Sequence, residues 1–259
     1  MKTKNINFII GSILVGIMLV FVLIGIFYTP YNPNQMDGSV KNMAPSFTHF
    51  FGTDNFGRDI FSRCMEGAKT TFLVAIITVS IGVIFGTVIG AISGYYGGIL
   101  DEIFMRIIDV LLAFPSILLA LVFVSVLGTG TFNIIVALGI LFIPSFARVV
   151  RSEVIAIKQL DYVKNAKLMG ASSLRIMFVH ILPSTFPILL SAITIGFNNA
   201  ILAEAGMSYL GLGVQPPEAS LGRMLSEAQT YIFSAPWYAI APGIIIVVTV
   251  LGFSLMNEG

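Results

Sequence analysis

The chain has 259 residues, of which 56% are hydrophobic and 10% charged, and its formal net charge is +1. This balance leaves too little polar surface to coat a soluble globule of that length, so the composition predicts an integral membrane protein. A net charge near zero, with no basic patch outside one segment described below, argues against nucleic acid as a partner. Cys64 is the single cysteine, which excludes an internal disulfide.

The first membrane spans follow from the need for about 20 mostly apolar residues per crossing. Residues 8–28 form an uncharged run that exceeds the roughly 7–15-residue core of a signal peptide and lacks a small-residue cleavage site, so we expect a retained first span. The second span lies in the uncharged stretch 70–100 and should turn near Gly94, Gly97 and Gly98.

Four further spans complete the expected topology. The uncharged stretch 110–147 is far too long for one helix and is interrupted near its middle at residues 128–131, which predicts a helical hairpin formed by spans three and four. Span five covers about residues 184–207, and span six about residues 236–256. The sequence therefore predicts an all-α membrane protein with six transmembrane helices.

The distribution of basic residues sets the expected orientation. With six spans, both termini lie in the cytoplasm together with the turn 94–106 and the loop 148–183. This arrangement places nine of the fourteen Lys and Arg residues inside, Lys2 and Lys4 among them, and cytoplasmic loops do collect basic residues. Residues 29–69 then lie outside and carry acids and bases in equal number, which indicates a folded polar loop.

A ridge of small residues marks one face of the second span. Gly82, Gly86, Gly90 and Gly94 recur every four residues, so another helix can approach that face closely. We expect a helix-packing face, since such ridges in membranes are more often helix contacts than the alternative, a pore-lining stripe.

The loop 148–183 is the only long basic segment, and its pattern predicts a bent pair of helices. Asp161 is placed to cap a short helix over residues 162–169, and Gly170 tolerates the left-handed backbone that would end it. Ser172 or Ser173 then caps a second helix, which runs toward Leu182-Pro183 with Leu174, Met177, Phe178 and Ile181 at helical spacing.

Two readings of this loop are open from its residues. Tyr162, Ala166 and Met169 should share one side of the short helix, with Lys164 and Lys167 near the other. The first reading is a knob presented to a cytoplasmic partner. The second is a basic interfacial helix that holds lipid headgroups.

Ionisable groups in or near spans are the usual pointer to a transport path. Asp109 and Glu204 are the candidates, with Asn198 and Asn199 as uncharged company, although pairing of Asp109 along one helix face with Glu102 and Arg106 is the favoured role. An enzyme is not expected, because His49 and His180 are the only histidines and fall on opposite sides of the predicted membrane.

The loop resembles the EAA loop of permease subunits of binding-protein-dependent ABC importers, whose pattern is Glu-Ala-Ala, three residues, Gly, nine residues, Ile, one residue and Leu-Pro. Gly170, Leu182 and Pro183 match that pattern, whereas Lys164-Asn165-Ala166 stands at Glu-Ala-Ala and His180 at Ile. Because the first Glu of the pattern is absent, the polar contact that this Glu makes in other members of the family is not expected here. The bent shape of the loop is still expected.

Further segments are similar to the peptide and nickel branch of that family, the dipeptide- and oligopeptide-permease C subunits. They extend from the outer loop almost to the C-terminus and read FGTDNFGRDIFSR at 51–63, DEIFMRIIDVLLAFPSILLAL at 101–121, MSYLGLGVQPP at 207–217 and SAPWYAIAPG at 234–243. The resemblance implies a type I ABC importer permease fold, with a first helix and outer loop over residues 1–68. A five-helix core over residues 69–259 would contain the coupling loop at about 150–183.

The resemblance also implies the partners and the site. The chain would be half of a translocation pathway for peptides, nickel or metal chelates in a bacterial or archaeal plasma membrane. A homologous permease, two cytoplasmic ATPase subunits and an extracytoplasmic solute-binding protein would complete the transporter. The chain has no phosphate-binding loop motif of its own, so it would bind no cofactor, and ATP and Mg would reside on the ATPases. The expected coupling residues are Asp161, Tyr162, Lys164, Ala166, Met169, Gly170, Ala171, Leu182 and Pro183.

Two other classes of function are the alternatives. A secondary transporter or channel subunit would work without ATPases, but would be expected to show internal repeats or charges near mid-span, and neither is evident. A purely structural membrane subunit is the third possibility. The solute itself is left open by the sequence.

Overall fold

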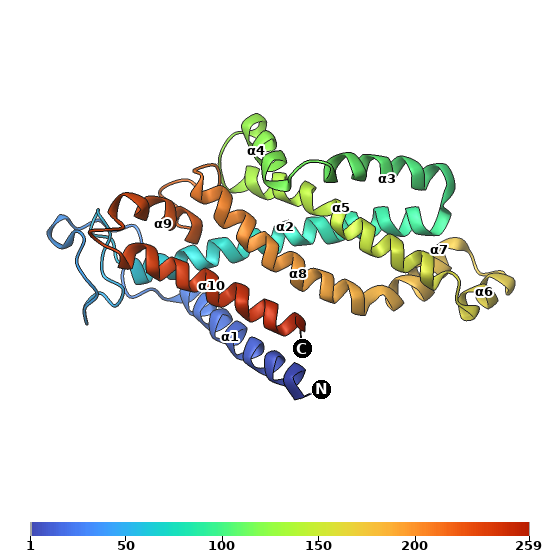
Figure 1. Cartoon of the computed structure of the whole chain (residues 1–259), viewed down its shortest axis with the longest axis horizontal. Helices are drawn as coiled ribbons and strands as arrows, with labels where there is room; N and C mark the ends of the chain where they lie inside the picture. The colour runs from blue at the N-terminus through green and yellow to red at the C-terminus, as the bar shows by residue number, and fades with distance from the viewer. Residues whose placement is uncertain (1, 259) are drawn as a thin grey trace. The chain divides into compact units, whose positions relative to one another are not determined.

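The regular structure of the protein is helical. The computed structural model describes residues 2–258, with side chains from residue 6 onward, so the side chains of Lys2 and Lys4 lie outside the described ones. The α-helices labelled in Figure 1 are α1 Lys2–Phe27, α2 Ile60–Tyr96, α3 Gly98–Leu112, α4 Ser116–Leu127, α5 Thr131–Ile157, α6 Asp161–Leu168, α7 Ser173–Arg175, α8 Leu182–Tyr209, α9 Leu221–Ala228 and α10 Trp237–Glu258. A π-helical segment, Ile176–Ile181, joins α7 to α8.

Within the described residues, five helices are long and apolar enough to cross a membrane, and the count is six when the bent pair α3 and α4 is taken as one span. The positions of α1, α5, α8 and α10 agree with the expected first, fourth, fifth and sixth spans. The six-span fold class is therefore confirmed, and the two remaining spans differ from expectation in their limits.

The second span begins earlier than expected. Helix α2 has 37 residues, or about 55 Å at 1.5 Å per residue, and starts at Ile60 rather than near residue 70. The carboxylate of Asp59 accepts a hydrogen bond from the Ser62 N–H at 2.8 Å and caps the first turn. Residues 60–69 are therefore helical, not part of the loop.

The first arm of the expected hairpin begins before residue 110, at Gly98, and consists of two short helices at an angle to each other. Helices α3 and α4 meet at an angle of 92° around Pro115, which cannot donate a backbone hydrogen bond. With 15 and 12 residues, each helix is too short to cross alone. The predicted turn between α4 and α5 is confirmed, because Gly128 and Gly130 adopt positive φ values of 90° and 128°.

The chain forms two compact units, each built from segments that are distant in the sequence. Unit 1 contains Met1–Ile76, Phe123–Ile135 and Phe197–Gly259. Unit 2 contains Ile77–Val122 and Val136–Gly196. Helices α2, α4, α5 and α8 contribute residues to both.

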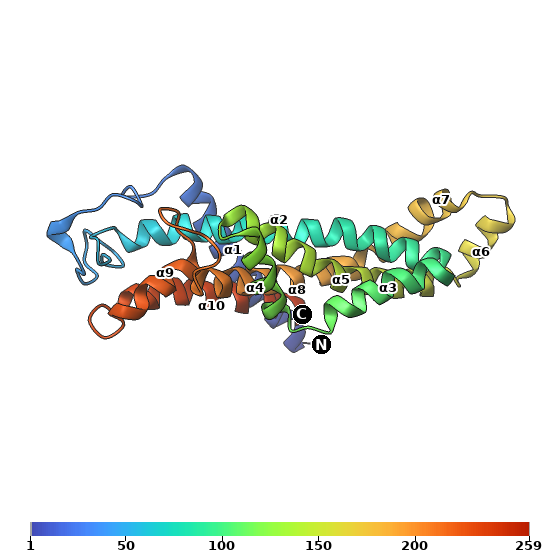
Figure 2. The same cartoon turned by 90° about the horizontal axis from the view of Figure 1, so that it is seen from above.

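In unit 1, α1 and α10 lie side by side (Figures 1 and 2). The contact depends on two glycines, since a Cβ atom on Gly11 would lie 2.7 Å from the carbonyl oxygen of Gly252. Backbone thus meets backbone where the two helices cross. The first and last helices of the chain therefore form one closely packed pair.

In unit 2, the glycine ridge of α2 faces α5. A Cβ atom on Gly90 would lie 2.5 Å from the carbonyl oxygen of Ala147, and one on Gly94 would lie 2.8 Å from that of Arg151. The other two glycines of the ridge, Gly82 and Gly86, approach α5 at Phe142 and Phe146. The structure thus places all four glycines against one helix, with no room for side chains.

Candidate functional site

The basic loop folds into a short helix with a sharply defined end. Helix α6 is preceded by Leu160 in an extended conformation, so Asp161 is the first helical residue and not the cap that the sequence predicted. At that position its carboxylate still lies at the positive end of the helix dipole. At the other end, Gly170 has a φ of 82°, and the N–H groups of Gly170 and Ala171 bond to the carbonyls of Lys167 and Ala166. These paired bonds form a Schellman motif, which fixes the bend after α6.

The second helix of the loop begins where Ser172 caps it. The Ser172 hydroxyl accepts a hydrogen bond from the Arg175 N–H. Helix α7, the π segment and α8 then continue as one helical stretch from Ser173 to Tyr209, which passes through Leu182 and Pro183. The π segment changes which residues face inward, so Ile176, Met177 and Ile181 are buried. Leu174 and Phe178 are exposed, against the expected stripe.

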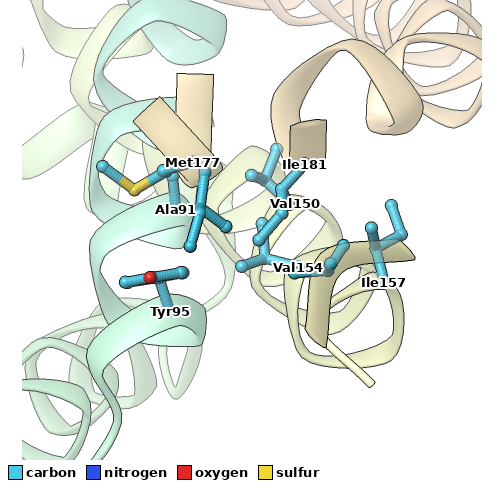
Figure 3. Packing of buried hydrophobic residues seen from close by; sticks show 9 residues of the cluster. Ala91, Tyr95, Val150, Val154, Ile157, Met177 and Ile181 are labelled. Atoms are coloured by element: carbon cyan, nitrogen blue, oxygen red, sulfur yellow. The ribbon is translucent and has the colours of Figure 1, made fainter. Parts of the chain in front are cut away.

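A buried cluster holds this bent segment against two helices of unit 2. Figure 3 shows Met177 and Ile181 directed toward Ala91 and Tyr95 of α2 and toward α5. Val163 anchors α6 in the same cluster, and Ala166, Ala171 and Leu182 pack against it partly buried. The remaining buried members of the cluster are Val150, Val154, Ile157 and Ile176. The base of the segment is therefore fixed by apolar packing.

The tip of the segment is free of such packing. Leu168 and Met169 are 85% and 88% exposed, whereas Ala166, which the sequence predicts to share one side of the short helix with Met169, packs against the buried cluster. Tyr162 is also largely exposed, and its hydroxyl lies 3.1 Å from the Ser184 hydroxyl. Val163 is the residue of α6 that enters the buried cluster.

The expected path residues lie in three different surroundings. Glu204 is fully buried, and its carboxylate accepts hydrogen bonds from the hydroxyls of Thr71 at 2.7 Å and Ser208 at 2.6 Å. The Oδ1 atom of Asn198 is buried without a hydrogen-bond partner among the described residues, and Asn199 is exposed. The structure thus gives Glu204 a cross-linking role between α2 and α8, and contact with solute stays a prediction.

The charges near the predicted inner boundary pair across helices more than along one. Asp109 accepts a hydrogen bond from Arg148 of α5 at 2.6 Å, and Asp101 forms two bonds with Arg151 at 2.5 and 2.6 Å. Arg106 lies 3.9 Å from Glu102, and both are exposed. Of the expected pairing along α3, only the contact between Glu102 and Arg106 is present, because Asp109 pairs with Arg148 of α5 instead.

Sequence reasoning missed a buried ion cluster in unit 1. Arg58 bonds Asp54 at 2.5 Å and Glu227 of α9 at 2.9 Å, and Glu227 also accepts a hydrogen bond from the Tyr238 hydroxyl at 2.7 Å. The fifth member, Arg63, lies 3.7 Å from Glu227. The cluster joins the Gly-Thr-Asp and Gly-Arg-Asp segment to the last third of the chain. No local spacing could have revealed partners that stand 169 residues apart.

The cluster also shifts the acidity of its members. Burial alone would raise the pKa of the Glu227 carboxyl, but the Tyr238 hydrogen bond and the charges of Arg63 and Arg58 outweigh burial and lower it. Burial would likewise lower the pKa of Arg58, and the adjacent Asp54 carboxylate raises it instead. Both groups are therefore held in their charged forms.

The described residues contain no group of three or more His, Cys, Asp or Glu side chains that could hold a metal ion. His49 is instead part of unit 1, where its Nδ1 lies 2.9 Å from Asp59 and its ring stacks on Tyr31 at 4.8 Å between centroids. His180 belongs to the π segment in unit 2.

Comparison with known proteins identifies the family. The family described as binding-protein-dependent transport system inner membrane component matches residues 86–258. The chain is 42% identical over 251 residues to the dipeptide transport system permease protein DppC of Alkalihalophilus pseudofirmus, covering 95% of this chain and 83% of that protein. It is 42% identical over 231 residues to the glutathione transport system permease protein GsiD of Pectobacterium atrosepticum, covering 89% and 77% respectively.

Solved structures support the fold. The inward-facing MetNI methionine ABC transporter has a chain that superposes with a TM-score of 0.60 at 19% identity, covering 74% of this chain and 91% of that one. An amino acid ABC transporter gives a TM-score of 0.58 at 21% identity, covering 75% and 91%. The curated relatives are named as transport permeases, which are non-catalytic membrane components. The chain therefore belongs to the family of binding-protein-dependent transport system inner membrane components, the permease subunits of ABC importers.

Proposed function

We propose that this chain forms half of the translocation pathway of an importer for short peptides and is driven through its basic loop by cytoplasmic ATPase subunits. The named relatives are dipeptide and glutathione permeases, and glutathione is itself a tripeptide, which favours peptide solutes. The nickel and metal-chelate solutes that the sequence left open have no such support among these relatives. Within this proposal, residues 69–259 act as the transport core.

The observation that carries the proposal is the contrast between the base and the tip of the bent segment. Val163 and Ile176 fix the base in a buried apolar cluster, whereas Leu168 and Met169 present two large apolar side chains to the surroundings. To transmit the movement of a partner, the segment needs a base that is fixed to the transmembrane helices and an end that the partner can bind. Exposed apolar tips of this kind are typical of surfaces that insert into a partner's groove.

The proposed mechanism is rigid-body transmission. Closure of two ATPase subunits on ATP and Mg would move α6, and the Schellman bend at Gly170 would pass that movement to α8 through the continuous helical stretch from Ser173. In this arrangement both termini and the bent segment from α6 through the π segment, hereafter the coupling segment, are cytoplasmic. A homologous permease and an extracytoplasmic solute-binding protein complete the assembly.

Substitution of Gly170 tests whether the bend matters. A β-branched residue is strained at a φ of 82°, whereas Asn tolerates the left-handed region, and nothing lies within 4 Å of the added Cβ in either case. Gly170→Val should therefore lose most of the co-purified ATPase subunits, and Gly170→Asn should retain them. Equal recovery with both variants would contradict a role for the bend.

Substitution of the tip separates coupling from folding. Met169→Asp places a charge on a side chain that makes no buried contact, so unit 2 should fold normally while ATPase recovery falls about tenfold or more, the equivalent of 1.4 kcal/mol. Phe233→Asp is the matched control, because Phe233 is likewise a highly exposed apolar side chain but lies in unit 1. Uptake of peptide by ATP-depleted vesicles under an ion gradient would instead establish a secondary transporter.

A further inference from the structure

Unit 2 contains a basic cavity close to the exposed tip formed by Leu168 and Met169. It has a volume of about 430 Å³ and lies where the end of α2 and the segment after α5 meet α6 and the start of α7. Leu168 and Met169 do not line it. The polar and aromatic groups that do are Tyr95, Tyr96, Lys158, Gln159, Lys164, Lys167 and Ser173.

The positive charge of this cavity is poorly compensated within unit 2. Lys158 donates a hydrogen bond to the neutral carbonyl of Tyr95 and lies 5.3 Å from the centroid of that ring. Lys164 lies 3.8 Å from Asp161, but Asp161 is 96% exposed, so this contact is weak. Lys167 forms no ion pair with any described residue, and none of the lining residues is acidic.

The arginines of α5 make the contrast clear. Arg148 and Arg151 each bind a carboxylate of α3 at hydrogen-bond distance. The three lysines instead line one cavity together with the hydroxyl group of Ser173, so three positive charges surround the same space. A bound anion with several acceptor oxygens would satisfy these donors together, and a phosphate group has that chemistry.

The position of the cavity along α2 indicates where the anion comes from. Residues 70–100 carry no charge, and Tyr95 and Tyr96 stand near the end of that stretch, as aromatic residues do at membrane interfaces. If the uncharged stretch spans the hydrocarbon core, its end at Tyr95 and Tyr96 lies at the level of lipid headgroups. Val163 and Ile176 add an apolar part to the lining of the cavity, which suits the glycerol portion of a lipid.

We infer that this cavity binds the phosphodiester headgroup of an anionic phospholipid between α2 and α6. Basic pockets between transmembrane helices bind such headgroups in other membrane proteins. The bound lipid would tie α6 to the end of α2 and so stiffen the base of the coupling segment. The site itself requires no ATPase, so it stands or falls separately from the proposed coupling.

Lipid retention by the purified full-length chain tests the inference. Native mass spectrometry would compare retention of phosphatidylglycerol and phosphatidylcholine by the wild-type chain and by Lys164→Gln/Lys167→Gln. Both lysines are exposed enough for the variant to fold. Each lysine near an anionic headgroup contributes about fivefold, so the double variant should retain phosphatidylglycerol about 25-fold less well. Arg106→Gln/Arg175→Gln is the control, since it removes the same charge from exposed sites of unit 2 that do not line the cavity.

The expected result is selective retention of phosphatidylglycerol that the cavity variant loses and the control variant keeps. An equal loss in both double variants would show diffuse surface attraction and overturn the site. Equal retention of the two lipids by the wild type, or displacement of phosphatidylglycerol by millimolar inorganic phosphate, would overturn the lipid headgroup as the ligand. Unchanged lipid retention with loss of ATPase recovery in the cavity variant would assign the lysines to the protein interface.

Discussion

Replacing Gly90 by alanine puts a methyl group where α2 meets the backbone of α5. The new Cβ would lie 2.5 Å from the carbonyl oxygen of Ala147, whereas carbon–oxygen contacts are ordinarily about 3.3–3.6 Å. The two helices would have to separate by roughly 1 Å along the ridge. A gap of that size forfeits about a quarter to a half of the dispersion energy of the atoms it separates.

The expected cost is that of overpacking, about 1–3 kcal/mol. Gly206→Ala is the control, because Gly206 is also helical and has nothing within 4 Å of an added Cβ. Both changes bring the same gain in helix propensity, so the difference between the variants isolates the clash. Thermal unfolding in detergent should therefore place the melting temperature of Gly90→Ala about 2–12 °C below that of Gly206→Ala. Equal melting temperatures would refute the close approach of α2 to α5.

Four further predictions concern polar contacts and helix packing. Glu227→Gln should destabilise the protein by about 3 kcal/mol, because it removes the carboxylate that pairs with both Arg58 and Arg63 and leaves Asp54 as their remaining acidic partner, whereas Glu66→Gln breaks only a more exposed pair and should cost about 0–1 kcal/mol in denaturant titrations. Since the folded-state pKa of Glu227 is lowered, its stabilisation is complete above the unfolded value of about 4.3 and is lost as pH falls through the folded-state value. Wild type should therefore lose more stability than Glu227→Gln between about pH 5 and about pH 3. Arg151→Gln should lower the melting temperature more than Arg148→Gln, because the Arg151 pair is the more buried, and equal effects would contradict this ranking. Gly222→Ala should reduce the yield of folded protein, since its Cβ would lie 2.2 Å from a carbonyl oxygen of α8; normal yield and stability would show that α9 does not pack there.

Local sequence signals predicted where the helices of the bent segment begin and end better than they predicted which side chains are buried. Gly170 ends α6 as its tolerance of positive φ predicts, and Ser172 caps the next helix. The inward face was misjudged because regular helical spacing was assumed, whereas the π segment rotates Ile176 inward and leaves Phe178 exposed. Such a segment changes residue spacing without a recognisable sequence pattern.

Hydropathy predicted where the chain crosses the membrane but not where helices begin or break. Helix α2 starts at Ile60 because Asp59 caps it, a signal that the sequence contains but that a search for uncharged stretches overlooks. The break at Pro115 lies within an apolar run, where hydropathy is uniform. The ion pair of Arg58 with Glu227 depends on tertiary folding and has no local signature.

The central claim, that the exposed tip at Met169 faces the cytoplasm and contacts the ATPases, is tested most directly by labelling Met169→Cys with a membrane-impermeant maleimide. The native thiol of Cys64 is fully buried and should remain unlabelled. The account predicts labelling in inverted vesicles only, with protection when the ATPase subunits are added. Labelling in right-side-out vesicles, or unchanged labelling in the presence of the ATPases, would contradict it.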